Sequence, residues 1–405
     1  MERHFITYEE ALEIISKNTD RFETVQTPLA ECVGHWLAED LVADRDFPPF
    51  DRVTMDGIAI AYTSYDEGKR SFEIEAVAAA GEPQKTLLHP QKCVEVMTGA
   101  ILPKGVDTVI RYEDIHIKEG IATFVGEKVR AKQNVHIQGG DIPKGSTITP
   151  KEKQLSGAEV MLAATIGKTE LKVYRLPKVA VCATGDELVP VSATPEPHQI
   201  RSSNVHGLQA MFRQWGISAD VFHLKDDKDA MQKTVSELLE RYETLVFSGG
   251  VSKGKFDYLP EVFRSIGIKE CFHKVKQRPG KPFWFGKHGD GTLVFALPGN
   301  PVSTFVCTNI YIRFWLYRAL GITPDTLYVK LVEDVIFPPE LTYFPEAKIR
   351  SLKDGTLTAT VIKGNGSGDF TNLTRTDGFL ILPRDKELFA AGERYPFVSY
   401  RNLGY

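Results

Sequence analysis

The sequence predicts a multidomain α/β protein whose second half contains a domain with a parallel sheet. Between about residues 175 and 325, apolar runs of strand length alternate with helical patterns, which is typical of parallel sheets. Three of these runs, 179–183, 244–247 and 292–297, stop at turns of small residues. A chain of 405 residues is too long for one compact domain, so two to four domains are expected.

The remaining elements follow in order along the chain. The first 25 residues are expected to be helical, with Thr7 as a cap. Short strands follow to about residue 145, and a second helix over 150–167 ends at Gly167. We expect the two helices to pack together, which makes the β-rich segment an insertion. The predicted domains are a helical domain of 1–25 plus 146–175, an inserted β-rich domain of 26–145, an α/β domain of 176–327 and a C-terminal β domain of 328–405.

Composition narrows the class of protein. The formal net charge is -4, which gives no reason to expect nucleic-acid binding. The five cysteines are scattered without a C-x-x-C pair, as suits a reducing cytoplasm. The start of the chain lacks the pattern of a signal peptide, and polar or charged residues interrupt the apolar stretch 302–320. We therefore expect a soluble, cytoplasmic protein with no membrane partner.

The three strand-end turns predict a ligand-binding crevice. Their sequences are Thr184-Gly185-Asp186-Glu187, Ser248-Gly249-Gly250-Val251-Ser252 and Pro298-Gly299-Asn300-Pro301. Open α/β sheets bind ligands outside the carboxyl ends of their strands, and glycine lets the backbone approach a ligand closely. Free amides of the second turn and of the helix after Pro301 would favour an anion such as phosphate. The alternatives are a tight turn without a ligand at Gly249-Gly250 and a helix cap at Asp186-Glu187.

Charged residues near these turns indicate a metal ion and an oxyanion. Asp186, Glu187 and Asp257 are oxygen ligands of the kind that Mg²⁺ prefers. Asp226 and Asp227 follow another predicted strand, 218–224, and either cap the helix 228–239 or contribute to the metal site. Lys276, Arg278 and Lys281 lie in a loop that Pro and Gly should make rigid, and fixed cations suit a phosphate or another oxyanion.

The β-rich segment carries three further turns with polar side chains. These are Asp51 to Gly57, Thr98-Gly99-Ala100 and Gly139-Gly140-Asp141. Taken singly, each is most simply an ordinary turn.

Together, the motifs resemble those of a known family. They occur in the order seen in molybdopterin molybdenumtransferases, the MoeA family, which includes the E domain of gephyrin. The motifs that carry the resemblance are Met55-Asp56-Gly57, Thr98-Gly99-Ala100, Gly140-Asp141, Thr184-Gly185-Asp186-Glu187-Leu188, Ser248-Gly249-Gly250-Val251-Ser252, Asp257-Tyr258, Pro279-Gly280-Lys281-Pro282 and Pro298-Gly299-Asn300-Pro301-Val302-Ser303.

The resemblance implies a fold and a reaction. Members of this family convert adenylylated molybdopterin and molybdate into molybdenum cofactor and AMP, with help from Mg²⁺. Their fold combines a split helical domain, an inserted β domain, an α/β molybdopterin-binding domain and a C-terminal β-barrel-like domain. They form homodimers in which the inserted domain of one subunit completes the cleft of the other. Contact with the upstream adenylyltransferase is also expected.

The resemblance further implies roles for individual residues. The catalytic set would be Asp56, Thr98, Asp141, Glu187 and Asp257, with the first three reaching the cleft from the partner subunit. The metal ligands would come from Glu187 and Asp257, and from Asp226 and Asp227, for which the residue pattern itself leaves a metal role open. The residues that bind the pterin, the nucleotide or molybdate would be Thr184, Gly185, Asp186, Ser248, Gly249, Gly250, Ser252, Arg278, Lys281, Pro298, Asn300, Pro301 and Ser303.

The chain departs from the family pattern at a few positions. Val53 stands where a Ser is usual, with Arg52 beside it, and His136 stands where an Arg is common. Lys253 and Lys255 add positive charge after the Ser-Gly-Gly turn. Three other functions stay open at this point: a relative that inserts tungstate, a pterin-binding or scaffold protein without catalysis, and a nucleotide hydrolase that uses the same crevice.

Overall fold

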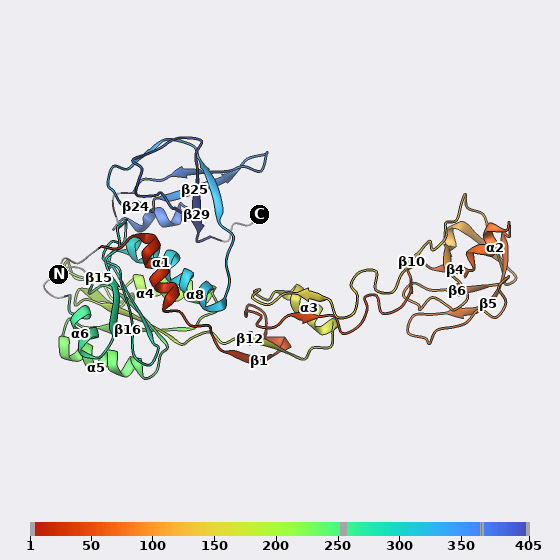
Figure 1. The fold of residues 1–405 in the computed structure, drawn as a ribbon, viewed down its shortest axis with the longest axis horizontal. Helices are drawn as coiled ribbons and strands as arrows, with labels where there is room; N and C mark the ends of the chain where they lie inside the picture. The colour runs from red at the N-terminus through yellow and green to blue at the C-terminus, as the bar shows by residue number, and fades with distance from the viewer. Residues whose placement is uncertain (1–4, 252–256, 365, 367, 402–405) are drawn as a thin grey trace. The chain divides into compact units, whose positions relative to one another are not determined.

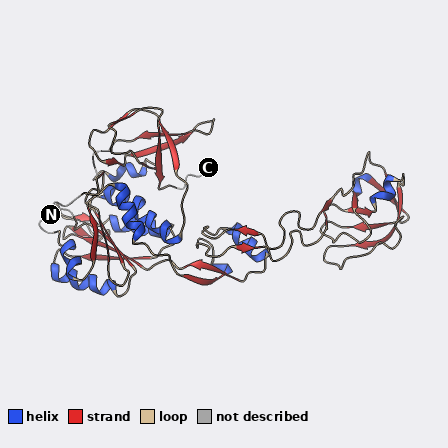
Figure 2. Ribbon diagram, viewed as in Figure 1, coloured by secondary structure: helices blue, strands red, loops and turns tan. Residues whose placement is uncertain are grey.

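The computed structural model describes residues 5–251, 257–364, 366 and 368–401. The chain divides into two compact units: residues 1–25 with 174–405, called the main unit, and residues 26–173, called the inserted unit. Figures 1 and 2 show the helices and strands of each unit. Among the described residues, every helix is too short or too polar to cross a lipid bilayer.

The main unit contains a six-stranded sheet in the order β16, β13, β17, β21, β20, β18. The first four strands are parallel neighbours, as the sequence predicts, whereas the last two pair antiparallel. Their bounds are β16 Ala219–Leu224, β13 Val179–Thr184, β17 Thr244–Ser248, β21 Leu293–Leu297, β20 Trp284–Lys287 and β18 Lys269–His273. The parallel register places the carboxyl ends of β13, β17 and β21 side by side, with Ala183 opposite Ser248 and Ser248 opposite Leu297.

Helices cover both faces of this sheet (Figure 1). Helices α5 and α6 share an apolar cluster with one face, and α4 and α7 lie on the other. The bounds are α4 Asn204–Gln214, α5 Lys228–Leu239, α6 Leu259–Ser265, α7 Pro301–Cys307 and α8 Arg313–Leu320, with a π-helical turn η3, Thr308–Ile312, between the last two. The helix expected after Pro301 is therefore present, with one wider turn in its middle.

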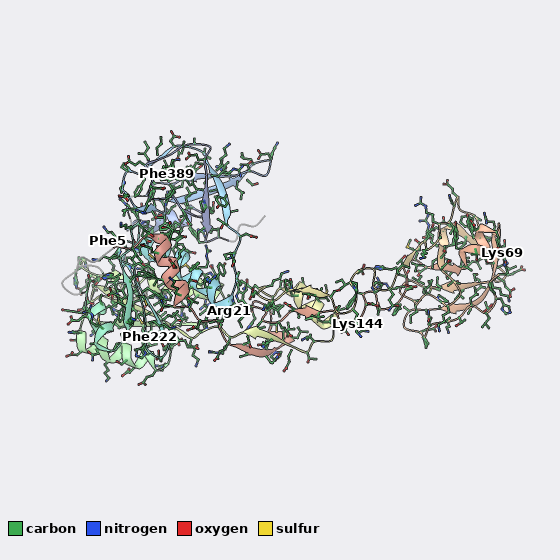
Figure 3. All side chains as sticks on the ribbon, viewed as in Figure 1. Phe5, Arg21, Lys69, Lys144, Phe222 and Phe389 are labelled. Carbon is green, nitrogen blue, oxygen red and sulfur yellow. The ribbon has the colours of Figure 1, made fainter. Side chains whose placement is uncertain are left out.

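A closed five-stranded barrel follows, as expected for the C-terminal β zone. Its strands, in neighbour order, are β22 Leu327–Leu331, β26 Leu357–Val361, β25 Glu346–Ser351, β27 Gly378–Leu380 and β29 Arg394–Ser399. Inward-facing apolar residues such as Val329, Ala347 and Phe397 form its core, with Phe389 packed against them (Figure 3). The shorter elements around it are β23 Val335–Ile336, β24 Thr342–Tyr343, β28 Leu388–Phe389 and the 3-10 turn η4, Phe370–Thr374.

The inserted unit is β-rich, as predicted. Its larger sheet runs in the order β7, β4, β6, β5, β9, β8 and packs two apolar clusters. The bounds are β7 Thr108–Arg111, β4 Gly57–Ile60, β6 Cys93–Val96, β5 Ser71–Ala78, β9 Ile121–Phe124 and β8 Ile115–Lys118. The other elements are β1 Thr24–Pro28, β2 Leu41–Val42, β3 Arg52–Val53, β10 Val135–His136, β11 Thr147–Thr149, β12 Glu170–Tyr174, the helix α2 Tyr62–Asp66 and the 3-10 turns η1 Leu29–Glu31 and η2 Tyr112–Asp114.

Both helices that the sequence predicts outside the α/β zone are present, each with a capping box. Thr7 caps α1, Tyr8–Lys17, and Ser156 caps α3, Gly157–Thr165. They belong to different compact units, so the expectation that they pack together stays a prediction. Helix α1 lies against α8 in the main unit, with Tyr8 edge-on to Tyr311, whereas α3 lies against η1 in the inserted unit. Each helix buries its apolar face against neighbours that the sequence pattern alone did not identify.

Candidate active site

A cavity of about 430 Å³ lies at the carboxyl ends of β13, β17 and β21, where the sequence predicts a crevice. We call it the strand-end cavity. It is lined by residues of all three turns and of the segments facing them: Thr184, Gly185, Glu187, Ile200 to Asn204, Asp226, Ser248, Gly249, Gly250, Asp257, Gly299, Asn300 and Pro301. Of the residues predicted on the strand-end turns and the acids near them, Asp186, Asp227 and Pro298 lie outside this lining. Ser252, Lys253 and Lys255 lie outside the described residues.

Two glycines let the first and second turns fit together. Gly185 has φ +135°, and a Cβ there would overlap the carboxylate of Glu187. Gly249 has φ +102°, and a Cβ there would lie 2.7 Å from the hydroxyl oxygen of Thr184. Both conformations are ones that residues with a side chain rarely adopt. Glycine at these two positions therefore leaves room for Glu187 and Thr184 to lie close to the backbone of the cavity wall.

Asn204, which the sequence analysis did not identify, ties the second and third turns together. Its Nδ2 donates to Ser248 Oγ at 2.9 Å and to the carbonyl of Gly299 at 2.7 Å. Thr304, in α7, donates to the carbonyl of Pro298 at 2.5 Å. Asn204 begins helix α4, and its sequence signal is an Asn at a helix start, which is common for reasons unrelated to function.

The acidic residues divide into a structural and a cavity-facing group. Asp227 caps α5 by accepting a hydrogen bond from the backbone N–H of Ala230 at 2.8 Å. This confirms the helix cap, one of the two roles that the sequence predicts for Asp227. Asp186 accepts from the backbone N–H of Asp226 at 3.2 Å. The helix-cap alternative for Asp186 and Glu187 is wrong, because strand β14, Leu188–Val189, follows them and pairs with β15, Ile200–Arg201.

The acidic side chains near the strand-end cavity repel one another, and this repulsion favours the binding of the predicted cation. Burial raises the pKa of Asp226, and the negative charges of Asp186, Glu187 and Asp257 add to that effect. Three of the four carboxylates line one cavity and supply oxygen ligands, so they fit a divalent cation that would relieve the repulsion. In the described part of the chain, His, Cys, Asp and Glu side chains form no preassembled group of three or more with a ligating arrangement.

A second cavity, of about 520 Å³, lies beside the predicted cationic loop. We call it the cationic-loop cavity. Its lining includes Arg278, Lys281, Pro298, Asn300 and Ser303 from the α/β part and Tyr343 and Glu346 from the barrel. Asn300 lines both cavities, so the two share a wall at the third strand end.

The loop is held in place, as the sequence predicts from its Pro and Gly content. Arg278 lies in the short strand β19, Gln277–Arg278, which pairs with β24. The side chain of Gln277 donates to the carbonyl of Pro279 at 3.1 Å and accepts from the hydroxyl of Tyr311. The ammonium of Lys281 lies 4.6 Å from the ring centre of Phe5, the residue labelled in Figure 3. This cation–π contact limits how far the charge can move.

The candidate acids of the inserted unit are also held by hydrogen bonds. Asp56 Oδ1 accepts from the backbone N–H and the hydroxyl of Thr98, which lowers the pKa of the Asp56 carboxyl. Asp141 lies 2.8 Å from Nε2 of His136, whose Nδ1 lies 3.3 Å from a guanidinium nitrogen of Arg52. Because β3 pairs with β10, with Arg52 opposite His136, this chain of contacts is built into the strand register.

Three family models match successive parts of the chain, from residue 6 to residue 399. The family model described as MoeA N-terminal region (domain I and II) matches residues 6–167, the probable molybdopterin binding domain matches 180–318, and the MoeA C-terminal region (domain IV) matches 328–399. The chain belongs to the MoeA family.

Individual relatives agree. The chain is 37% identical to the molybdopterin molybdenumtransferase of Synechocystis over 96% of its own length and 98% of that protein, and 31% identical to one from Staphylococcus epidermidis over 96% and 94%. Two crystal structures of molybdopterin biosynthesis MoeA protein from Pyrococcus horikoshii have TM-scores of 0.83, identities of 27% and 25%, and cover 98% of this chain and all of theirs.

Membership of the MoeA family makes the chain a transferase of molybdenum-cofactor biosynthesis.

The structure shows what surrounds two of the residues that depart from the family pattern, Arg52 and His136. Guanidinium groups only donate hydrogen bonds, so Arg52 requires a lone pair on Nδ1 of His136. In a neutral ring that meets this requirement, Nε2 carries the proton and faces Asp141. His136 thus lies between Arg52 and the Asp141 carboxylate and contacts both. Nothing in the structure explains Val53 in place of Ser.

Proposed function

We propose that this MoeA-family chain inserts molybdenum from molybdate into adenylylated molybdopterin and releases AMP in an Mg²⁺-dependent reaction. The observation that carries the proposal is the shared wall at Asn300 between a cavity of backbone amides and carboxylates and a cavity of fixed cations. A large organic phosphate and a small dianion need such unlike environments side by side. The dithiolene sulfurs that receive molybdenum belong to the substrate, which is in keeping with a site that uses no cysteine.

The strand-end cavity would bind the pterin and the nucleotide. Glycine turns at Gly185, Gly249 and Gly250 would bring backbone amides close to the phosphates, and Thr184 and Ser248 would add hydroxyl groups. Asp186 and Ser252 stay predicted members of this set. Molybdate would bind in the cationic-loop cavity, between Arg278 and Lys281, with Pro298 and Ser303 shaping its wall. Pro301, also predicted for this pocket, lines the strand-end cavity instead.

Glu187, Asp226 and Asp257 are the residues we assign to Mg²⁺, because they line one cavity and repel one another without a cation. Asp227 stays a weaker candidate, since one of its oxygens already caps α5. When bound, Mg²⁺ would neutralise charge on the phosphate that leaves with AMP. The carboxylates of the chain would hold the diphosphate group in position and keep it apart from the molybdate site.

We further propose a homodimer in which Asp56, Thr98 and Asp141 of the partner subunit complete the cleft. Support comes from the hydrogen bonds that hold Asp56 to Thr98 and Asp141 to His136 and so limit the directions of these side chains. The four domain boundaries given by the sequence, contact with the adenylyltransferase that supplies the substrate, and a cytoplasmic location belong to the same proposal.

Anaerobic incubation with adenylylated molybdopterin, Mg²⁺ and molybdate tests the function, with reconstitution of an apo-molybdoenzyme and AMP release as readouts. Formation of active cofactor together with AMP is the expected result. Binding of the pterin without either product would indicate a pterin-binding or scaffold protein instead. AMP release without cofactor would indicate a hydrolase. A parallel arm with tungstate decides between the two oxyanions.

A further inference from the structure

The cationic-loop cavity contains a carboxyl group, Glu346, that neither the sequence patterns nor the proposed binding of a dianion explains. Glu346 is the first residue of barrel strand β25, and its half-buried side chain lines the same cavity as Arg278 and Lys281. Its Oε2 is enclosed and has no hydrogen-bond partner in the described part of the chain. A buried carboxylate oxygen without a partner is destabilising, so the group needs either a proton or a ligand.

The surroundings of Glu346 favour the proton. Burial, and to a smaller extent the negative charge of Asp369, raises the pKa of Glu346 to about 7. Tyr343 faces both Arg278 and Glu346, and Tyr400 also faces Glu346; burial raises the pKa of both phenols, so both stay neutral donors near pH 7. Lys281 is directed toward Phe5. Burial and the charge of Asp369 therefore leave Glu346 able to hold a proton near pH 7.

We propose that Glu346 acts on the bound oxyanion in its carboxylic-acid form, donating its proton to one oxygen of the anion. This inference rests on the proposed function and adds a residue to it. A tetrahedral dianion held by Arg278 and Lys281 presents its other oxygens to the rest of the cavity wall, which includes Glu346. A protonated Glu346 gives that wall a hydrogen-bond donor, whereas an ionised Glu346 repels the anion.

The proton also serves the chemistry, because one oxygen of molybdate must leave. Molybdate and the two thiol groups of the dithiolene give a species with two Mo–S bonds and three Mo–O bonds, plus one water. In the proposed sequence Glu346 gives its proton to the departing oxygen, the first thiol supplies that oxygen's second proton, and water leaves. The proton of the second thiol returns to Glu346. Charge and atoms balance, and molybdenum is neither oxidised nor reduced.

Titrating molybdate alone into the protein by calorimetry at pH 6, 7 and 8 tests the binding step. For the natural protein we expect affinity to fall by about tenfold from pH 6 to pH 8, as the protonated fraction of Glu346 falls. In Glu346→Gln the amide stays a neutral donor, so affinity should be high and independent of pH. Asp369→Asn should move the fall in affinity to lower pH. Glu340→Gln is the matched control, since Glu340 is a surface barrel residue paired with Arg384.

Insertion assays with the same proteins test the proton transfer. Glu346→Gln should bind molybdate well yet insert it at least about tenfold more slowly at saturation, because an amide does not give up its proton. Unchanged insertion in that variant, or a natural pH dependence of molybdate binding that survives in it, would overturn the inference. If the natural protein binds molybdate with the expected pH dependence but forms no cofactor, the proposed function fails while the role of Glu346 in anion binding stands.

Discussion

Asp56 Oδ1 accepts two hydrogen bonds from Thr98, one from its backbone N–H at 2.6 Å and one from its hydroxyl at 2.8 Å. Both bonds favour the ionised carboxylate, and together they lower the pKa of Asp56, the backbone bond more than the hydroxyl bond. The two residues lie 42 positions apart in sequence. Each lies on a turn that, taken singly, the sequence does not distinguish from an ordinary turn. Their pairing gives the inserted unit a carboxylate of fixed charge and direction.

Thr98→Val tests this pairing. The substitution keeps the backbone bond and removes the hydroxyl bond, so the pKa of Asp56 should rise part of the way toward its usual value. Charge on Asp56 would then be lost at a higher pH as a solution is acidified. Titration of the Asp56 carboxyl carbon by NMR measures this directly. Thr123→Val, at a hydroxyl that bonds Ser71 instead, should leave the titration as it is.

Removal of a cavity carboxylate should damage catalysis more than binding. Glu187→Ala and Asp257→Ala are expected to slow AMP release by about a hundredfold, or roughly 3 kcal/mol, through lost stabilisation of charge at the phosphate. Pterin affinity, measured by fluorescence titration, should change far less. The control is Glu261→Ala, whose carboxylate pairs with Lys228 at 2.6 Å. Full turnover in both cavity variants would refute the metal assignment.

Composite sites predict complementation between inactive subunits. A mixed dimer of Asp56→Ala and Glu187→Ala chains carries both faults in one cleft and leaves the other cleft intact. Each mixed dimer should therefore have about half of the activity of a natural dimer, while each variant alone stays inactive. Sedimentation provides the control on assembly, and a fully active monomer would contradict the prediction.

The charge of Lys281 should govern molybdate affinity. Lys281→Ala is expected to raise the molybdate concentration for half-maximal insertion by about tenfold or more, roughly 1.4 kcal/mol. Arg278→Lys should also weaken binding, because a point charge replaces a planar fork. Lys276→Ala serves as the comparison, since the cavity lining includes Lys281 but not Lys276. If the molybdate concentration for half-maximal insertion is the same in Lys281→Ala as in the natural protein, molybdate binds at another site.

Glu346 should make stability depend on pH. Its pKa in the folded protein, about 7, lies above the ordinary value of 4.5, so ionisation opposes folding. The penalty is absent below the unfolded pKa, grows as pH rises between the two values, and is complete above the folded one. Glu346→Gln should therefore raise the thermal unfolding midpoint at pH 8 and leave it nearly unchanged at pH 4. An equal shift at both pH values would speak against the raised pKa.

Much of the main unit could be predicted from sequence because its signals are local. Buried parallel strands are continuous apolar runs, and helix limits are marked by caps, so β13, β17, β21 and α5 were placed almost to the residue. The same logic placed the strand-end turns in one crevice, since neighbouring parallel strands end at the same edge of the sheet. Asp227 as the cap of α5 was one of the two alternatives that local pattern allowed.

The tertiary structure decided what depends on contacts between distant segments. Asn204 reaches the turns at Ser248 and Gly299, which lie 44 and 95 residues away, and nothing in its own neighbourhood indicates this. Helix α1 packs on α8, a partner that the sequence did not identify, because an amphipathic pattern shows that a face is buried but not which partner buries it. In the sequence, nothing distinguishes Glu346 from other polar residues at strand starts. Only the folded barrel shows that it lies in the wall of the cationic-loop cavity. Sequence periodicity fixes which side chains share a face, whereas the register and packing of remote elements decide which of them meet.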